Sequence, residues 1–156
     1  MKPPVMKIIE DDLTGPEIYA LLNEHMASMH ALSPPESVHA LDLSRLRQPE
    51  IRVWSAWEDA TLLGCGALKE LDANQGEVKS MRTPNTQRRR GAGRALLLHI
   101  IDVARSRGYK KLYLETGAVD EFKPAHYLYQ SVGFTFCEAF GDYTTDPHSV
   151  FMVLSL

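Results

Sequence analysis

Hydrophobic side chains along the chain follow two different periods, which separate helical segments from strand segments. Apolar residues recur every three or four positions in residues 18–29 and again in residues 97–104, as on one face of a helix. Residues 51–57 alternate as a strand does, and residues 62–71 return as a hairpin partner. The elements are predicted in the order strand, two helices, three strands, helix, strand, helix and two strands, which indicates a mixed α/β domain.

Turn and capping residues set the boundaries of these elements. The Thr-x-x-Glu sequence at residues 14–17 has the form of a capping box that starts the first helix, and Ser-Pro-Pro at residues 33–35 breaks it. Gly108 and Gly133 are placed to end two later helices. The predicted strands are 6–10, 51–57, 62–71, 77–83, 111–116, 134–140 and 149–154, and the helices predicted after the first are 37–46, 91–107 and 124–132.

Composition and charge are those of an ordinary globular chain. Its 156 residues have a hydrophobic fraction of 44% and a charged fraction of 24%, and no repeat, low-complexity segment or linker divides them. We therefore expect residues 1–156 to form a single domain. A formal net charge of −3 at pH 7 argues against a general nucleic-acid-binding protein, which would be basic overall.

The cysteines and the N-terminal residues favour a cytoplasmic protein. Cys65 and Cys137 lie far apart in apolar surroundings without metal-ligand spacing, so we expect both to be reduced and buried, and we expect no metal site. The first 13 residues contain three acidic side chains and no long apolar run, unlike a secretory signal peptide. Because no segment reaches the ~20 apolar residues of a membrane-spanning helix, no membrane association is expected.

The segment with the clearest chemistry is a glycine-rich turn between a strand and a long helix. Gly91 and Gly93 open this helix, where backbone N–H groups have no intrahelical partner and the helix dipole favours an anion. Charge-assisted donors surround the same point, namely Arg88, Arg89, Arg90 and Arg94. A P-loop is excluded because Arg94 and Ala95 follow Gly93, and a dinucleotide-binding fingerprint is excluded by Leu96. The alternative interpretation is a solvated basic turn.

Two motifs together resemble the GNAT superfamily of N-acetyltransferases. Residues 88–93, Arg-Arg-Arg-Gly-Ala-Gly, fit the R/Q-x-x-G-x-G/A loop that binds acyl-CoA in this family. Residues 125–134 fit the A-x-x-L-Y-x-x-x-G-F pattern of its last helix and following strand. The resemblance covers residues 50–155 well, and the chain looks like a small, single-domain bacterial member. Phe122 stands where many members carry an Asn that contacts the cofactor.

The resemblance implies a GNAT fold, an α/β architecture with flanking helices. Its sheet would be mixed and mostly antiparallel, with six to seven strands, and would splay between the fourth and fifth strands. The pantetheine arm of acetyl-CoA would lie in that gap, and the pyrophosphate at the glycine-rich turn. The cofactor-binding residues that the resemblance assigns are Met81, Arg82, Thr83, Arg88, Arg89, Arg90, Gly91, Ala92, Gly93, Arg94, Ala125 and Tyr129.

The resemblance also implies one general acid and one base. Tyr129 would protonate the departing thiolate of CoA, and the alternative is a half-buried tyrosine that only packs its helix. Glu77, at the start of the fourth strand, would take the proton of the amine directly or through water, and the alternative is a solvated strand-end charge. Glu115 is the second candidate base. His25 and His30 could face the acceptor but are expected at the surface.

The expected function is acetyl transfer from acetyl-CoA to an amine acceptor by direct transfer in a ternary complex. A small-molecule amine is the preferred acceptor; a peptide or protein amino group and a non-catalytic acyl-CoA-binding regulator are the alternatives. We expect the acceptor pocket to be walled by residues 26–36, by the hairpin of the second and third strands and by residues 141–148. No nucleic-acid partner is expected, and the sequence leaves open whether the protein is a homodimer.

Overall fold

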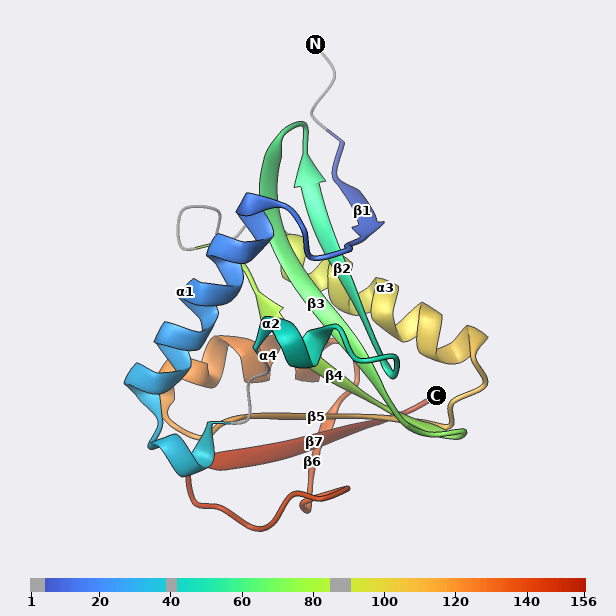
Figure 1. Ribbon diagram of the computed structural model, residues 1–156. Helices are drawn as coiled ribbons and strands as arrows, with labels where there is room; N and C mark the ends of the chain where they lie inside the picture. The colour runs from blue at the N-terminus through green and yellow to red at the C-terminus, as the bar shows by residue number, and fades with distance from the viewer. Residues whose placement is uncertain (1–4, 39–41, 85–90) are drawn as a thin grey trace.

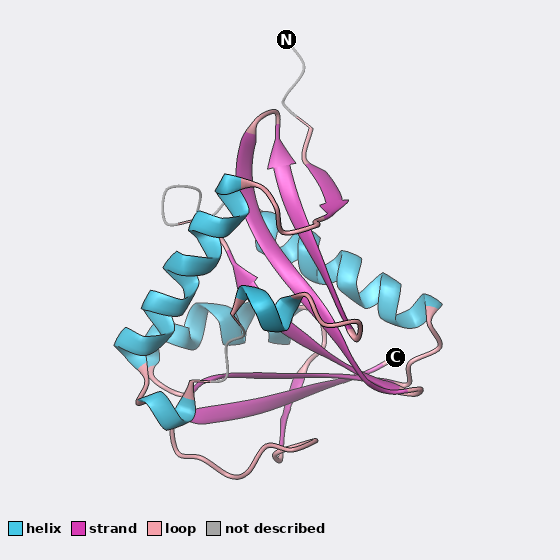
Figure 2. Cartoon of the chain, in the orientation of Figure 1, coloured by secondary structure: helices cyan, strands magenta, loops and turns pink. Residues whose placement is uncertain are grey.

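In the computed structural model, residues 5–38, 42–84 and 91–156 are described, and they form a seven-stranded sheet with helices on both faces (Figures 1 and 2). The strands are β1 (Lys7–Glu10), β2 (Ile51–Glu58), β3 (Thr61–Asp72), β4 (Gln75–Arg82), β5 (Lys111–Gly117), β6 (Thr135–Cys137) and β7 (Ser149–Ser155). The helices are α1 (Pro16–Leu32), α2 (Leu43–Leu46), α3 (Ala92–Ser106) and α4 (Lys123–Ser131), with 3₁₀ turns η1 (Pro35–Ser37) and η3 (Asp120–Phe122).

The strand order is β1-β2-β3-β4-β5-β7-β6. Among the described strands, β4 and β5 pair in parallel, and every other neighbouring pair is antiparallel. A parallel pair needs a long crossover connection, and α3 supplies it between β4 and β5. The mixed, mostly antiparallel sheet with flanking helices that the sequence predicted is therefore confirmed.

β4 and β5 stay paired over only part of their length. The last pair of their ladder is Val78 with Leu114, although β4 continues to Arg82 and β5 to Gly117. Ser80 has a φ of 54°, in the left-handed region, and the β3–β4 register shifts beside it. Such a β-bulge bends its strand. The end of β4 consequently leaves β5, and Figure 2 shows the two halves of the sheet diverging from their common end.

Two hydrophobic clusters cover the opposite faces of the sheet. On one face, α3 buries Leu96, Leu97 and Ile100 completely, in a cluster that also includes residues of β5 and β7. On the other face, α1 buries Ile18 and Leu21 against β2 and β3. Each such side chain contributes about 1.5–3 kcal/mol when it is removed from water. The two helices thereby hold the sheet from both sides, as Figure 1 shows.

The predicted capping box at residues 14–17 is wrong. α1 begins at Pro16, and Gly15 is its N-cap without a side-chain cap hydrogen bond. The hydroxyl of Thr14 instead donates to Asp12 Oδ1 at 2.6 Å. Short polar side chains compete in this way for nearby groups, and proline is well suited to the first helical position.

Two further predicted elements are shorter than expected. The single helix predicted at 37–46 is wrong, because η1 ends before the extended residue Val38 and α2 is a separate turn that the Asp42 side chain caps. The strand predicted at 134–140 is reduced to β6. The chain leaves the sheet after β6, and the ring of Phe140 stacks on Tyr113 of β5 at 4.6 Å. Aromatic packing on the sheet face replaces strand pairing there.

The two cysteines differ in exposure. Cys65 is buried as predicted, whereas the prediction for Cys137 is wrong, since this residue is partly exposed on the edge strand β6. Both thiols are free. Within the described residues, no helix is long and apolar enough to cross a membrane.

Candidate active site

The diverging end of β4 presents the backbone that the sequence analysis assigned to pantetheine. Met81 and Arg82 end β4 beyond its last pairing with β5, and Thr83 follows the strand. The other edge of β4 stays bound to β3 through the pair of Arg82 with Cys65. The β5-facing edge of this segment therefore lies outside the β4–β5 ladder, where its polar groups can bind a ligand.

The start of α3 has the geometry of an anion site. Gly91 is the N-cap with a φ of 82°, a left-handed conformation that glycine adopts without strain, and Ala92 and Gly93 follow in the first turn. Among the described residues, nothing lies within 4 Å of the position that a Cβ of Gly91 would occupy. At Gly93 the nearest atom to such a Cβ would be a methyl carbon of Leu128, 3.4 Å away. The unpaired N–H groups of a helix start are favourable partners for phosphate.

The arginines assigned to the pyrophosphate fall into two groups. Arg94 is exposed on the first turn of α3, and its Nη1 donates to Ser131 Oγ on α4 at 3.1 Å. Arg88, Arg89 and Arg90 lie outside the described residues, and their assignment stays a prediction.

α4 buries the predicted general acid, Tyr129. Its ring packs edge-on to Phe134, with centroids 5.9 Å apart, and only 7% of the residue is exposed. Burial, together with the negative charge of Glu115, raises the pKa of Tyr129 well above its usual range. The phenol therefore stays protonated at physiological pH, as a proton donor must.

Two contacts fix α4 against the end of β5. His126 Nε2 lies 2.8 Å from the carbonyl oxygen of Gly117 and forms a hydrogen bond with it. The ring of Phe122 lies so close over Gly117 that no Cβ could be accommodated there. Phe122, at the position where the family often has Asn, thus packs against β5. Ala125, assigned to the cofactor, is partly buried against the core.

Glu77 belongs to a buried polar network. Its Oε2 accepts a hydrogen bond from Lys79 Nζ at 2.9 Å and another from the hydroxyl of Tyr143 at 2.7 Å. Lys79 Nζ also lies 2.9 Å from the Tyr143 oxygen. Because Glu77 is only 2% exposed, the alternative of a solvated strand-end charge is excluded. The carboxylate is held by a cation and a phenol from two different segments.

Sequence reasoning missed Lys79 and Tyr143. Lys79 had a usable signal, since residues two apart on a strand share a face and opposite charges there attract. Tyr143 lies in the segment 141–148 that was expected to wall the acceptor pocket, but nothing local in the sequence indicated its contact with Glu77 across the connection between β6 and β7.

Glu115 lies on β5 just beyond the last β4–β5 pair. Burial raises the pKa of its carboxyl group to about 7, and the Ser149 hydroxyl and the charge of Lys79 oppose part of this rise. The charges of Glu77 and Asp146 act in the same direction as burial. A carboxyl group with this pKa exchanges protons readily at physiological pH.

His25 contradicts its expected surface position. It is 8% exposed on the face of α1 that packs on the sheet, and its buried Nδ1 has no hydrogen-bond partner among the residues that the structure describes. Burial, and then the charge of Arg82, lowers its pKa to about 4. Arg82 forms an ion pair with Glu24, the preceding residue of α1, at 3.1 Å. α1 thereby packs a neutral imidazole and an ion pair against the end of β4.

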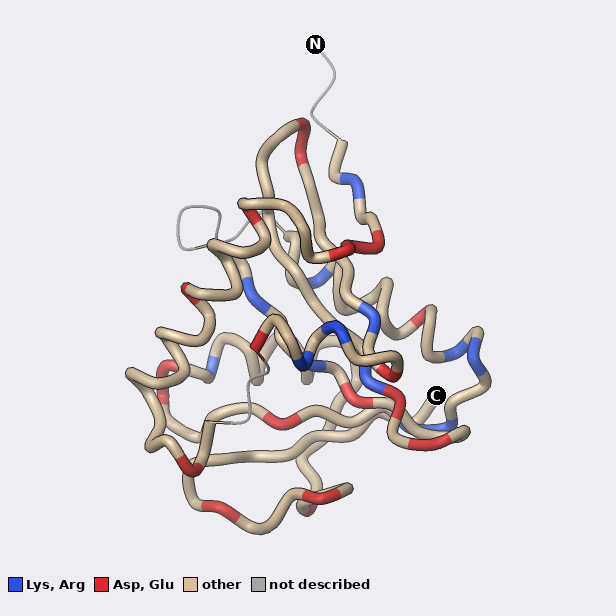
Figure 3. The backbone as a smooth tube through the Cα atoms, in the orientation of Figure 1, with Lys and Arg blue, Asp and Glu red and all other residues tan. Residues whose placement is uncertain are grey.

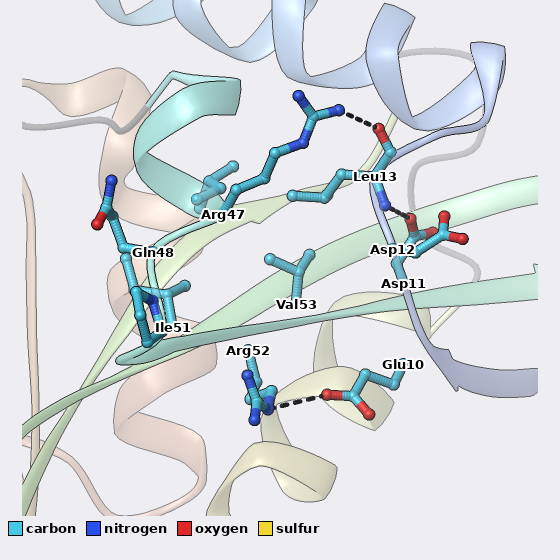
Figure 4. Close-up of a pocket in the computed structure, with 11 residues that line it drawn as sticks. Glu10, Asp11, Asp12, Leu13, Arg47, Gln48, Ile51, Arg52 and Val53 are labelled. Atoms are coloured by element: carbon cyan, nitrogen blue, oxygen red, sulfur yellow. Dashed lines mark hydrogen bonds and ion pairs between the residues drawn. The ribbon is translucent and has the colours of Figure 1, made fainter.

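A separate hollow of about 380 Å³ lies between the β1–α1 connection, α2 and β2 (Figure 4). Both of its arginines bond to protein groups: Arg52 pairs with Glu10 at 3.2 Å, and Arg47 donates to the carbonyl of Leu13 at 3.1 Å. None of the predicted site residues lines it. Within the described residues, no group of three or more His, Cys, Asp or Glu side chains could hold a metal ion.

Comparison with known proteins identifies the family. The model of the acetyltransferase (GNAT) family matches residues 18–134. The chain belongs to this family. The uncharacterised N-acetyltransferase YsnE of Bacillus subtilis is 56% identical over 151 residues, which cover 97% of this chain and 100% of that protein.

Solved structures agree with this assignment. A structure from Klebsiella pneumoniae, named for an inferred acyl-CoA N-acyltransferase activity, is 29% identical with a TM-score of 0.81, and the match covers 97% of each chain. A Bacillus subtilis acetyltransferase in complex with CoA is 20% identical with a TM-score of 0.70, covering 97% of this chain and 99% of that one. At that identity the second likeness shows the fold alone. Solved structures of this fold therefore include an acetyltransferase with CoA bound.

Replacing Glu115 with Gln is expected to stabilise the protein more at pH 8 than at pH 5. The pKa of Glu115 is about 7 when folded and 4.5 as the reference value, so unfolding releases a proton between these values and stability falls as pH rises through them. Gln cannot ionise and avoids this loss, of which roughly 2–3 kcal/mol accrues between pH 5 and pH 8. Urea unfolding of both proteins at the two pH values measures the difference.

Glu121→Gln is the matched control, because Glu121 is exposed. It should change the free energy of unfolding little at either pH. A Glu115→Gln effect of the same size at pH 5 and pH 8 would contradict the raised pKa.

Proposed function

We propose that the protein transfers the acetyl group of acetyl-CoA to the amine of a small molecule, by direct transfer in a ternary complex. The observation that carries this proposal is the divergence of β4 from β5, which begins beside Glu115, together with the open helix start at Gly91 and the buried phenol of Tyr129. In this proposal the free edge of β4 and the start of α3 bind acetyl-CoA. Tyr129 and Glu115 then transfer the protons of the reaction. Membership of the GNAT family and the relative named as an N-acetyltransferase support it.

The residues present fit acetyl-CoA. The N–H groups of Gly91, Ala92 and Gly93, together with the Arg94 side chain, would hold its pyrophosphate. Arg88, Arg89 and Arg90 complete the proposed site. The backbone of Met81, Arg82 and Thr83 would bind pantetheine and polarise the thioester carbonyl, and each well-aimed donor of this kind is worth about 3 kcal/mol. The thioester supplies an activated acetyl group, and the protein orients it.

Glu115 is better suited than Glu77 to take the proton of the amine. Glu77 is engaged by Lys79 and Tyr143, so protonating it would weaken a buried ion pair and a hydrogen bond. Glu115 has a pKa of about 7, which leaves a large fraction of it as the carboxylate at neutral pH and still makes it an effective base. We therefore assign the base role to Glu115 and a structural role to Glu77.

Tyr129 acts as the general acid. The amine nitrogen bonds to the thioester carbon, the carbon–sulfur bond breaks, and the sulfur leaves as a thiolate that needs a proton. The phenol of Tyr129 donates that proton, while Glu115 accepts one from the amine. The negative charge of Glu115 contributes to the raised pKa of Tyr129, which supports placing the two groups in one site. A non-catalytic acyl-CoA-binding protein would need neither group buried in this way.

The reaction is tested by incubating the protein with acetyl-CoA and a panel of amines. The panel contains polyamines, arylalkylamines, amino acids, amino sugars and a peptide with a free N-terminus. We expect thiol release that depends on the amine, with an acetylated product detected by mass spectrometry. Binding of acetyl-CoA without transfer to any member would favour the non-catalytic alternative, and no binding at millimolar acyl-CoA would contradict the proposal.

Tyr129→Phe separates proton donation from packing. The substitution keeps the buried ring and removes the hydroxyl, so kcat should fall on the order of 10²-fold while KM for acetyl-CoA changes less. Tyr127→Phe is the control, because Tyr127 is 65% exposed on the same helix. Single-turnover rates avoid limitation by product release. If the Tyr129→Phe variant keeps the wild-type single-turnover rate, the hydroxyl has no part in the reaction.

A further inference from the structure

Glu115 occupies the middle strand of a three-strand surface. On one side, β5 pairs with β4 up to Val78–Leu114, so Lys79 stands next to Glu115 on the same face. On the other side, Glu115 pairs directly with Phe151 of β7. Lys79 and Phe151 therefore flank the carboxyl group.

Tyr143 touches both of these flanking residues. Its hydroxyl donates to Glu77 Oε2 at 2.7 Å and lies 2.9 Å from Lys79 Nζ, both on β4. Its ring lies against Phe151 of β7, with centroids 5.5 Å apart. A side chain that reaches β4 with one end and β7 with the other passes across β5. The Tyr143 side chain thus lies across β5 at the level of Glu115, from β4 on one side to β7 on the other.

The segment that carries Tyr143, residues 138–148, follows β5 along its length. Phe140 stacks on Tyr113 near the start of β5 at 4.6 Å. At the far end, the amide of Ala118 donates to the carbonyl oxygen of His148 at 3.0 Å. Asp146 accepts a hydrogen bond from the hydroxyl of Ser37 in η1, which ties the segment to the region after α1. The segment is therefore fastened at its start, middle and end.

We propose that Tyr143 is a positioning residue: by fastening residues 138–148 across β5 it keeps water from Glu115 and forms the wall against which the acceptor amine is held. The proposal rests on the role of Glu115 as the base in the proposed function. In this proposal the buried Glu77–Lys79 pair has a structural role, because both side chains bind the Tyr143 hydroxyl and hold it in place. Burial of this anchor protects its hydrogen bonds from competition with water.

The charges around Glu115 come from three elements. Glu77 and Lys79 face it from β4, Asp146 and the Tyr143 phenol from residues 138–148, and the Tyr129 phenol from α4. Glu77 and Lys79 have opposite charges and largely cancel. Loss of the Tyr143 hydroxyl leaves these charges in place and admits water to Glu115. Hydration favours the carboxylate, so the pKa of Glu115 should fall toward its ordinary value.

The test compares Tyr143→Phe with Tyr113→Phe. Both keep their rings in the aromatic cluster, but within the described residues the Tyr113 hydroxyl has no hydrogen bond to lose. Hydrogen exchange of amides 139–148 should accelerate about tenfold in Tyr143→Phe, the scale for one lost buried hydrogen bond. A ¹³C NMR titration of the Glu115 carboxyl, assigned with Glu115→Gln, should show its pKa lowered by about one unit. KM for the best amine of the panel should rise, with KM for acetyl-CoA unchanged.

The proposal would be overturned if the Tyr143→Phe variant had the same hydrogen-exchange rates for amides 139–148 and the same Glu115 pKa as the Tyr113→Phe variant. Should Tyr143→Phe fail to fold, Ser37→Ala loosens the same segment from its other end and is judged by the same two measurements. Neither measurement needs turnover. A shift of both in a protein that acetylates no amine would support the fastening of residues 138–148 and refute the proposed function.

Discussion

The divergence of β4 from β5 is the constraint on which the rest of the structure depends. In a continuous sheet, the backbone N–H and C=O groups of Met81 and Arg82 on the β5 side would form hydrogen bonds with β5 and could not bind a ligand. The bulge at Ser80 bends β4 away, at the cost of a non-glycine residue with φ of 54°, which is of order 1–3 kcal/mol. The packing of α1 and α3 on opposite faces holds the two halves of the sheet in place. Strain at one residue thus creates a gap that a ligand can fill.

The ionisable side chains around this gap differ in burial and in the partners that their charged groups have. The carboxylate of Glu77 bonds to Lys79 and Tyr143, whereas burial raises the pKa of the half-buried Glu115 to about 7. Two carboxyl groups on neighbouring strands therefore differ in environment, and this difference is why we propose Glu115 and not Glu77 as the base. Tyr129 completes the arrangement, because burial keeps its phenol protonated beside Glu115. The environment, and not the residue type, separates the roles.

The succession of helices and strands along the chain, the long helix α3 and the glycine-rich turn could be predicted from the sequence because each depends on local periodicity or on a short motif. A short motif also carries the assignment of Tyr129 as the general acid, which stays a prediction. The burial of His25 and the contact of Tyr143 with Glu77 could not, since both depend on segments that meet only in the folded chain. The predicted helix at 37–46 failed because Val38 is extended after η1, and only the short α2 packs apolar residues, Leu43 and Leu46, into the core.

The most direct test of this account is a backbone NMR titration of the protein with CoA. Binding in the β4–β5 gap predicts the largest amide shifts at residues 80–83, at Gly91 to Arg94 at the start of α3 and at the end of β5. Residues that line the hollow of Figure 4 should change little. Shifts concentrated in that hollow, or spread without preference for the gap, would contradict the claim that the divergence of β4 and β5 forms the acyl-donor site.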